Sequence, residues 1–263
     1  MSWRRLLIEL GADLQAADSA GNTALHAAVQ AETLPGIGAA SRKPSGTMDR
    51  VSLIRLLLAR GADPNARLAE ERPRDANSHT EIADRLIDNG VSLGGATPFL
   101  LAARAADIGV MRLLLAHGAD PQVTTFENTS PLAAAAGVGY NQSRRQPSEE
   151  QALEAVAWLV ELGNDINLAN KHGQTPLHGA VYAACDRCIE FLAGKGARLD
   201  ASDALGRTPL KLAEEGFFQL ASRLPRDSSA ALLAALGQDT PEAARARRAN
   251  PTPRIIVQRD RVP

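Results

Sequence analysis

Aromatic residues, long apolar runs and an excess of either charge are all scarce in this sequence. Phe, Trp and Tyr make up 3% of its 263 residues, so we expect a core of Leu, Ala, Val and Ile between closely packed helices. The formal net charge is −1, from 29 basic and 30 acidic residues, and this balance argues against nucleic acid or an anionic membrane as the partner. No apolar run approaches the roughly 20 residues that span a bilayer, so we expect no transmembrane segment.

Cysteine occurs only twice, as Cys185 and Cys188, in the spacing C-x-x-C. This spacing permits a thioredoxin-like site, in which a reactive thiolate attacks disulfides. The surrounding pattern favours structural roles, because Cys188 falls on the apolar stripe of a predicted helix and Cys185 lies in the turn before it, with no strand preceding. The sequence has no second cysteine pair to complete a zinc site. We therefore predict neither a redox centre nor a metal site.

A regular repeat organises the chain. The triplet Thr-Pro-Leu that begins at Thr175 recurs at Thr208, and the Gly-Ala pair that begins at Gly196 follows Gly163 by the same interval. A fixed period of this kind is the signature of a solenoid, in which stacked units share one continuous core. Residues 170–202 form the clearest single unit.

Each unit is predicted to contain a polar finger, an inner helix and an outer helix. In the clearest unit, Thr175 is a good N-cap, and Pro176 suits the first helical position, where its missing N–H costs nothing. The outer helix is expected over residues 187–195, and Gly196 supplies the left-handed residue that ends it. Neither helix can bury its apolar face alone, so neighbouring units must stack.

These residues resemble the ankyrin repeat, whose pattern is roughly D-x-x-G-x-T-P-L-H-x-A-A, a helical run, then L-L-x-x-G-A-D-x-N-A. The match is strongest over residues 170–216, and the closing motif is complete at residues 61–66. The resemblance implies an all-α ankyrin-repeat solenoid of about five to six repeats, the first one partial, with protein binding and no shared reaction. The insertions and the Ala-rich, Arg-over-Lys composition resemble a bacterial group of such proteins.

Two regions are predicted, a repeat array over residues 1–237 and a disordered Pro/Arg-rich tail over residues 238–263. Three insertions interrupt the array, at about residues 32–49, 67–93 and 140–150. The first and third lengthen connections between inner and outer helices, and the second enlarges a finger. Within the second, a capping-box pattern predicts an additional helix that begins near Ser78 and ends before Gly90.

The two ends of the array have different patterns. Residues 3–10 read as an outer helix without its inner helix, so we expect upstream repeats or a partner to cover this face. At the other end, a short helix from Ser228 or Ser229 to Gly237 is expected to cover the last repeat.

Histidines and repeated aspartates are the candidates for chemistry, and each has a structural explanation. In the family, the imidazole of T-P-L-H bonds the backbone and the capping Thr, and His26 and His178 occupy this position. Asp63, Asp120 and Asp165 recur once per repeat, and a stacking distance of about 10 Å keeps them too far apart to share a proton. The sequence contains no glycine-rich phosphate loop and no nucleophile elbow. We predict no enzyme activity and no cofactor.

Exposed residues at finger tips and in the long connections are the candidates for recognition. Phe126 is an aromatic residue at a predicted tip, where it either anchors a partner or folds back on the enlarged neighbouring finger. The first and third insertions carry basic residues and would emerge on one edge about 20 Å apart, although loop closure also tolerates insertions that bind nothing. The candidate partner-binding residues are Phe126, Glu127, Tyr140, Arg144, Arg145, Lys171 and His172.

The predicted function is a non-catalytic protein–protein interaction module that binds through a concave face of fingers and inner helices. The alternative is a regulatory or targeting subunit of an enzyme complex, with the basic tail as its docking arm. The expected partner is a protein, acidic if the basic loops contact it, and the chain is expected to be a monomer unless its N-terminal face is covered. The opening residues do not read as a secretion signal, so the cytoplasm is the default location, with the periplasm or secretion open if a signal lies upstream.

Overall fold

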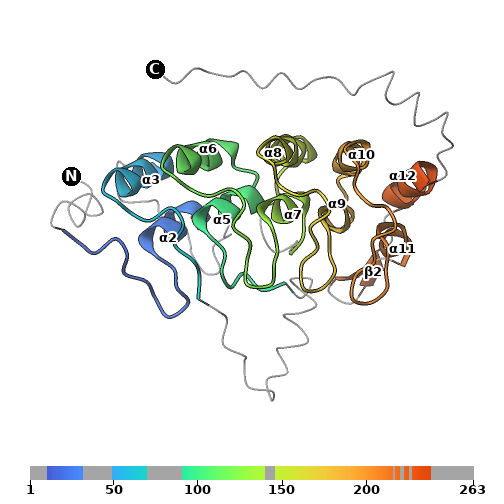
Figure 1. The fold of residues 1–263 in the computed structure, drawn as a ribbon, viewed down its shortest axis with the longest axis horizontal. Coiled ribbons are helices and arrows are strands. Elements are labelled where there is room, and N and C mark those ends of the chain that lie inside the picture. Colours follow the sequence, from blue (N-terminus) through green and yellow to red (C-terminus); the bar gives the residue numbers. More distant parts are fainter. Residues whose placement is uncertain are drawn as a thin grey trace, which may run out of the picture.

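The computed structural model describes residues 11–31, 49–69, 91–139, 146–215, 217–219, 222–224 and 227–237. Over these ranges the chain is a stack of helix pairs that form an inner and an outer row (Figure 1). The inner row contains α2 (Ala24–Gln30), α5 (Pro98–Arg104), α7 (Pro131–Ala136), α9 (Pro176–Ala183) and α11 (Pro209–Glu215). The outer row contains α3 (Arg50–Ala59), α6 (Ile108–Ala116), α8 (Glu149–Glu161), α10 (Asp186–Gly194) and α12 (Asp227–Gly237).

Capping residues begin the inner helices where the sequence predicts. Thr97 precedes α5 in extended backbone, and its hydroxyl accepts a hydrogen bond from the Leu100 amide at 3.2 Å. Ser130 does the same for α7 by accepting from the Ala133 amide at 3.1 Å. In both helices a proline follows the cap, where no N–H is needed. Because helices this short are marginal alone, their stability comes from packing against their neighbours.

The core runs through the stack as one continuous cluster of mainly aliphatic side chains between the two rows. Leu25, Phe99, Leu132 and Leu177 occupy the same place in four successive inner helices, two residues after the cap, and all are fully buried. Burial of such a side chain contributes about 1.5–3 kcal/mol. The core is therefore a repeated contact between helices, as the low aromatic content predicts.

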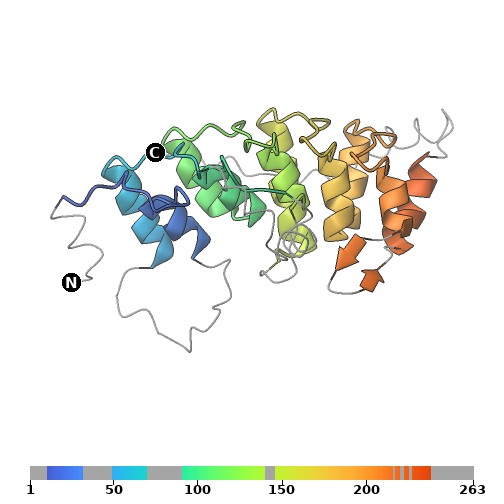
Figure 2. The same cartoon turned by 90° about the horizontal axis from the view of Figure 1, so that it is seen from below.

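A small hairpin between α11 and α12 was not predicted from the sequence. It consists of β1 (Phe217–Gln219) and β2 (Ser222–Leu224), which pair in antiparallel orientation. It lies at the edge of the stack where the inner helices end (Figure 2). The all-α solenoid is confirmed as the fold class, because the hairpin lies within one connection and adds no layer. The predicted final helix is also present, as α12.

Connections from inner to outer helix alternate between long and short along the stack. The long connections are α2–α3 at residues 31–49, α7–α8 at residues 137–148 and α11–α12 at residues 216–226. The short connections are α5–α6 at residues 105–107 and α9–α10 at residues 184–185. The first two long connections correspond to predicted insertions, and the third contains the hairpin.

Several predicted features lie outside the described residues and stay predictions. They are the outer helix at residues 3–10, most of the insertion at 32–49, the helix expected between Ser78 and Gly90, and the tail at 238–263. The candidate residues Tyr140, Arg144 and Arg145 also lie outside them.

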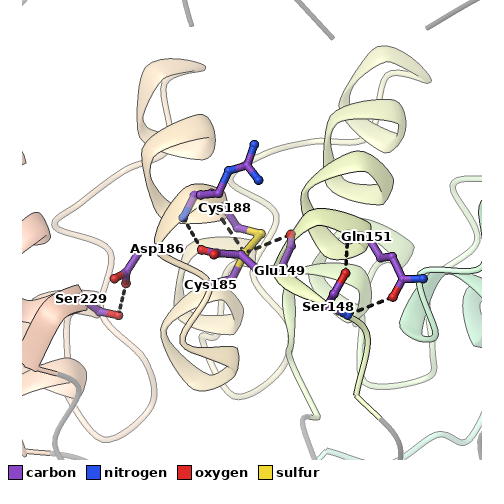
Figure 3. The surroundings of a disulfide bond; sticks show 8 residues. Ser148, Glu149, Gln151, Cys185, Asp186, Cys188 and Ser229 are labelled. Atoms are coloured by element: carbon purple, nitrogen blue, oxygen red, sulfur yellow. Dashed lines mark hydrogen bonds between the residues drawn. A yellow bond between two sulfur atoms is a disulfide. The ribbon is translucent and has the colours of Figure 1, made fainter. Parts of the chain in front are cut away.

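A disulfide joins Cys185 to Cys188 at the start of α10 (Figure 3). Cys185 is the capping residue of this helix, and its sulfur accepts a hydrogen bond from the Cys188 amide at 3.3 Å. Asp49, Asp107 and Ser148 occupy the same capping position in three other outer helices. The position agrees with the structural role predicted for the pair, but neither the bond nor the burial of Cys185 was predicted.

Candidate interaction surface along the fingers

The fingers precede the inner helices, and we number them one to five by their described residues. Finger 1 is 17–23, finger 2 is 66–69 with 91–96, finger 3 is 124–129, finger 4 is 169–174 and finger 5 is 202–207. Backbone hydrogen bonds join their tips, and in each bond an amide of one finger donates to a carbonyl oxygen of the preceding finger. The bonds are Ala69 N to Ala20 O (3.0 Å), Phe126 N to Gly94 O, Lys171 N to Glu127 O and Ala204 N to His172 O (2.8 Å each). This series, the tip ladder, makes the five fingers one continuous edge.

Polar side chains close the individual fingers. Asn170 Oδ1 accepts hydrogen bonds from the amides of His172 at 2.9 Å and Gln174 at 3.0 Å, and Asp203 makes the equivalent bonds in finger 5. Such turns fix the tip conformation through the residue's own neighbours. In finger 3, Asn128 adopts the left-handed conformation that glycine provides elsewhere, with φ of 63°, and its side chain donates to the backbone of finger 4.

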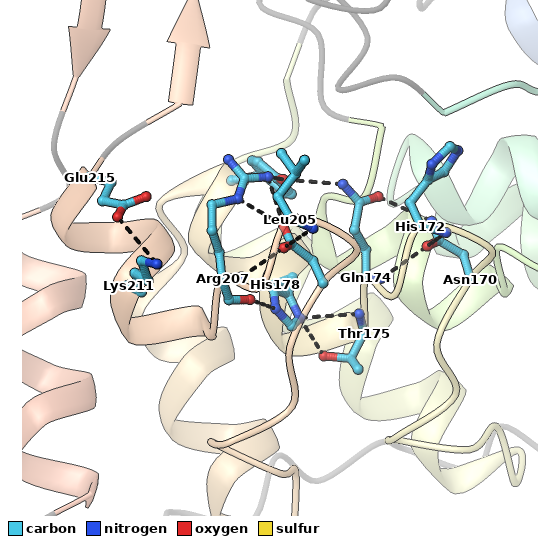
Figure 4. A network of polar contacts seen from close by, with 11 residues as sticks. Asn170, His172, Gln174, Thr175, His178, Leu205, Arg207, Lys211 and Glu215 are labelled. Atoms are coloured by element: carbon cyan, nitrogen blue, oxygen red, sulfur yellow. Dashed lines mark hydrogen bonds and ion pairs between the residues drawn. The ribbon is translucent and has the colours of Figure 1, made fainter.

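A buried polar network attaches fingers 4 and 5 to α9 (Figure 4). The Tyr182 hydroxyl oxygen accepts hydrogen bonds from Gln174 Nε2 at 3.1 Å and from Arg207 Nη2 at 3.2 Å. Arg207 also forms an ion pair at 2.7 Å with Asp203, whose side chain is almost completely buried. Burial raises the pKa of the Tyr182 hydroxyl. The network keeps two adjacent fingers in a fixed position relative to the helices.

Two buried histidines connect inner helices to the following fingers. His178 Nδ1 accepts a hydrogen bond from the Thr175 amide at 3.2 Å, so Nε2 carries the proton and donates to Arg207 O at 3.1 Å. His26 makes the same pair of contacts, with Nε2 lying 3.4 Å from Ala96 O. Burial lowers the pKa of both imidazoles. Their role is structural, as the sequence analysis predicted.

Phe126 is held in place but remains 40% exposed. The guanidinium of Arg67 lies over its ring, with Cζ 4.6 Å from the ring centroid. Arg67 is itself fixed, because Nε donates to Gly95 O at 3.0 Å and Nη2 donates to Thr124 O at 2.6 Å. The side chain therefore packs against finger 2, as one of the two predicted alternatives stated, and still presents part of its ring to solvent.

The other described candidates divide into two kinds. Glu127 Oε2 accepts from the Ser92 amide at 2.8 Å and lies 3.3 Å from His172 Nε2, so these side chains join fingers 2, 3 and 4. Lys171 is exposed at the tip of finger 4. Phe126 and Lys171 are thus exposed, whereas Glu127 and His172 are partly buried and contact neighbouring fingers.

The inner helices at the centre of the stack are closed to solvent. Every residue of α7 is buried, as is every residue of α5 except Arg104. Val91, in the returning half of finger 2, packs with Ala133 and Val138 beside α7. Arg104 donates to Gly139 O in the same region. Of the concave face expected from the sequence, the fingers are accessible here and the central inner helices are not.

The repeated aspartates do not form a carboxylate cluster. Asp63, Asp120 and Asp165 each accept a hydrogen bond from the amide two residues later, at 2.8, 2.9 and 2.8 Å. Among the residues that the structure describes, no three His, Cys, Asp or Glu side chains lie close enough together to hold a metal ion. Within the same ranges, no helix has the length and apolarity to cross a bilayer.

Models of known repeat families match most of the array. A model of three consecutive ankyrin repeats matches residues 148–234, and a model of a single ankyrin repeat matches residues 20–68 and 94–126. The chain belongs to the ankyrin-repeat family. The matched ranges include Phe126, Lys171 and His172.

Curated relatives carry similar sequence within longer proteins. B-cell lymphoma 3 protein homolog of Mus musculus is 28% identical over 202 residues, 74% of this chain and 39% of the relative. An ankyrin repeat, SAM and basic leucine zipper domain-containing protein 1 of Dasypus novemcinctus is 29% identical over 121 residues, 44% of this chain and 24% of the relative. Palmitoyltransferase ZDHHC13 of Homo sapiens is 27% identical over 173 residues, 55% of this chain and 28% of the relative. The chain spans less than half of each, and these relatives are eukaryotic, so they do not support the expected bacterial group.

Proposed function

We propose that this ankyrin-repeat chain is a non-catalytic protein–protein interaction module that contacts its partner mainly with its finger tips. The tip ladder carries the proposal, because it holds Phe126 and Lys171 at successive positions of one edge. Aromatic residues and arginine are enriched among residues that dominate binding energy, and Phe126 stacked on Arg67 supplies both. A side chain that is fixed before binding loses less conformational freedom when the partner arrives.

The basic edge predicted at the long connections stays part of the proposal. Arg144 and Arg145 belong to the connection α7–α8, and the other basic insertion belongs to the connection α2–α3, which joins the same kinds of helices two repeats earlier. Such an edge would favour an acidic partner. Changing both arginines to Glu should slow association at low salt, and an unchanged association rate would remove the basic edge from the proposal.

A matched pair of variants tests the finger-tip surface. Phe126→Ser removes the tip ring, whereas Val51→Ser alters a residue of similar exposure, 39%, in the outer helix α3. In quantitative affinity enrichment from the source cell, we expect Phe126→Ser to reduce retention of specific partners by about tenfold, which corresponds to about 1.4 kcal/mol. Val51→Ser should retain them. Equal retention by both variants, each shown to be folded by urea titration, would contradict the proposal.

A second candidate is a regulatory or targeting subunit of an enzyme complex, with residues 238–263 as a docking arm. The palmitoyltransferase relative favours it, because the similar region is only 28% of a protein named for an enzyme. The tail contains six arginines against Asp239, Glu242 and Asp260. If the tail is a docking arm, its deletion should weaken partner binding and remove most of the salt dependence. Unchanged binding would rule out the docking arm and leave the interaction module as the proposed function.

For the compartment we propose the cytoplasm as the default, and the disulfide provides a test. Disulfides persist in oxidising compartments and are reduced in the cytosol. Intact cells can be quenched in acid and the protein alkylated after denaturation. Alkylation of both Cys185 and Cys188 would agree with the cytoplasm, whereas a protected pair would indicate the periplasm or secretion.

A further inference from the structure

Finger 5 is the open end of the tip ladder. Its tip amide, Ala204 N, donates to finger 4. The next residue, Leu205, has a carbonyl oxygen that accepts no hydrogen bond from any residue that the structure describes. In fingers 3 and 4 the equivalent oxygens belong to Glu127 and His172, and each accepts the tip amide of the following finger. Among the described residues, Leu205 O therefore has no backbone donor, whereas the equivalent oxygens of fingers 3 and 4 each accept a hydrogen bond from the following finger.

Among the residues that the structure describes, none packs beside finger 5 on its outward side. A Cβ atom at Gly173 of finger 4 would lie 2.9 Å from Asp203 Cα, and one at Gly21 of finger 1 would lie 2.2 Å from the backbone of finger 2. At Gly206, which has the same place in finger 5, an added Cβ would meet nothing within 4 Å. The side chain of Leu205 is 73% exposed, the highest value among the large apolar side chains described as exposed. Figure 4 shows Leu205 in this last finger, next to the finger that carries His172.

The last inner helix offers a second contact to whatever occupies this space. His26 and His178 donate from their helices to carbonyl oxygens of the following fingers, at 3.4 and 3.1 Å. Lys211 has the equivalent place in α11, three residues after the cap Thr208. Its ammonium can donate to the same kind of carbonyl. Its ion pair with Glu215 is a 3.7 Å contact between two exposed side chains, which a competing partner can replace.

We infer that the open end of the tip ladder is a docking site for a tight turn of a partner protein. The inference rests on the proposed function and locates the partner at finger 5. The occupant supplies what fingers 2 and 5 each supply to the repeat before them: a backbone N–H, here for Leu205 O, and a backbone carbonyl, here for Lys211. An apolar side chain on the turn would cover Leu205. Main-chain hydrogen bonds at an open edge provide affinity, and the apolar contact provides selectivity.

A turn fits this site better than a further stacked repeat or a second copy of the chain. Lys211 corresponds to His178, which faces the next repeat, and Glu215 follows it one helical turn later on the same side of α11. A stacked inner helix would bury both charged groups, which is unfavourable. A turn at the finger edge leaves the helix row exposed and needs only the ladder contacts.

A peptide from the protein itself is a suitable probe. Residues 122–132 comprise finger 3, in which Phe126 supplies both the ladder amide and an apolar side chain. Cyclised through its ends and titrated at up to millimolar concentration into the ¹⁵N-labelled chain, this peptide should shift the amide resonances of Leu205, Gly206 and Lys211. The same peptide with an N-methyl group on the Phe126 nitrogen cannot donate this bond, and it should bind about tenfold more weakly.

Two protein variants complete the test. Leu205→Asp should weaken peptide binding by about tenfold, whereas Val51→Asp, at an exposed position of α3, should leave it unchanged. Shifts at Phe126 and Lys171 without shifts at Leu205 would overturn this inference and leave the proposed function intact. Equal binding of the N-methylated peptide, or no shift at any concentration, would also overturn it. Self-association of the wild-type chain that Leu205→Asp abolishes in sedimentation would make the occupant a second copy and overturn the assignment of a partner turn.

Discussion

Cys185 and Cys188 are alike in burial but differ in what a serine would meet. Serine at position 185 retains a good N-cap for α10, whereas serine at position 188 places a hydroxyl in the apolar core. Either change removes the disulfide, which closes a very short loop and contributes about 2 kcal/mol in the chain-entropy model.

We therefore expect Cys188→Ser to lower the free energy of unfolding by about 1–3 kcal/mol more than Cys185→Ser, measured by urea titration without reductant. Repeating the titration with reductant should bring wild type close to Cys185→Ser. If the two variants were equally stable, burial of residue 188 would contribute nothing beyond the disulfide. The sequence alone placed Cys185 in the turn before the helix, and the disulfide and its burial give that position a stabilising role.

The two buried histidines predict a stability that depends on pH. In the folded state burial holds the pKa of His26 and His178 below the ordinary value of 6.5, whereas the unfolded chain has the ordinary value. Below about pH 6.5 the unfolded state thus binds protons that the folded state does not. The free energy of unfolding should therefore fall as pH falls from 6.5, by up to about 1.4 kcal/mol per pH unit for each histidine.

Urea titrations between neutral and mildly acidic pH measure this slope. His178→Gln should remove about half of it, because His26 remains as the second buried imidazole. A slope that is identical in wild type and His178→Gln would show that the buried imidazole is not its source.

At the scale of the finger, Gly173 and Gly206 form a matched pair. Both have φ of +72°, so alanine is strained by about 1–2 kcal/mol at either position. Only at Gly173 does the added Cβ approach a following finger, at 2.9 Å from Asp203 Cα. We expect Gly173→Ala to be less stable than Gly206→Ala by about 1–3 kcal/mol in urea unfolding. Hydrogen exchange at the Ala204 amide should increase in the first variant only. Equal losses would mean that the two fingers separate at little cost.

The elements that could be predicted from sequence are those whose signals are local. Thr97 and Ser130 are capping residues followed by proline, so a few adjacent residues suffice to predict where their helices begin. Gly196, with its left-handed backbone, likewise marks where a helix ends. The hairpin β1–β2 has no such signal. The Phe-Phe pair at residues 217–218 is equally compatible with a buried helix segment.

Contacts between distant residues explain what the sequence did not predict of the candidate surface. Val91 packs with Val138, which lies in a later repeat, so closure of the central inner helices could not be foreseen. Leu205 looks like an ordinary tip residue, and its exposure follows only from the absence of another described finger after it. Phe126 was predicted either to anchor a partner or to fold back on the enlarged finger, and it packs against Arg67 of that finger while part of its ring stays exposed.

At the scale of the whole molecule, stability should depend on neighbouring repeats more than on the stack as a unit. Helix α12 buries Leu233 and Leu236 against the array and packs on α10 and α11. A chain that ends at residue 226 should therefore lose hydrogen-exchange protection in α10 and α11 and keep it in α5 and α6. A chain that ends at residue 237 is the control and should match wild type. Loss of protection along the entire array in the shorter chain would indicate a single cooperative unit.

The direction of the tip ladder has a consequence for biosynthesis. Every described bond runs from the amide of a later finger to the carbonyl of an earlier one. Ribosomes deliver the chain from its N-terminus at about 5–20 residues per second, so each acceptor is synthesised before its donor. An array of this kind can add one finger at a time to a surface that is already folded. At each stage the last finger to have folded, like finger 5 among the described residues, offers its carbonyl to the segment that follows.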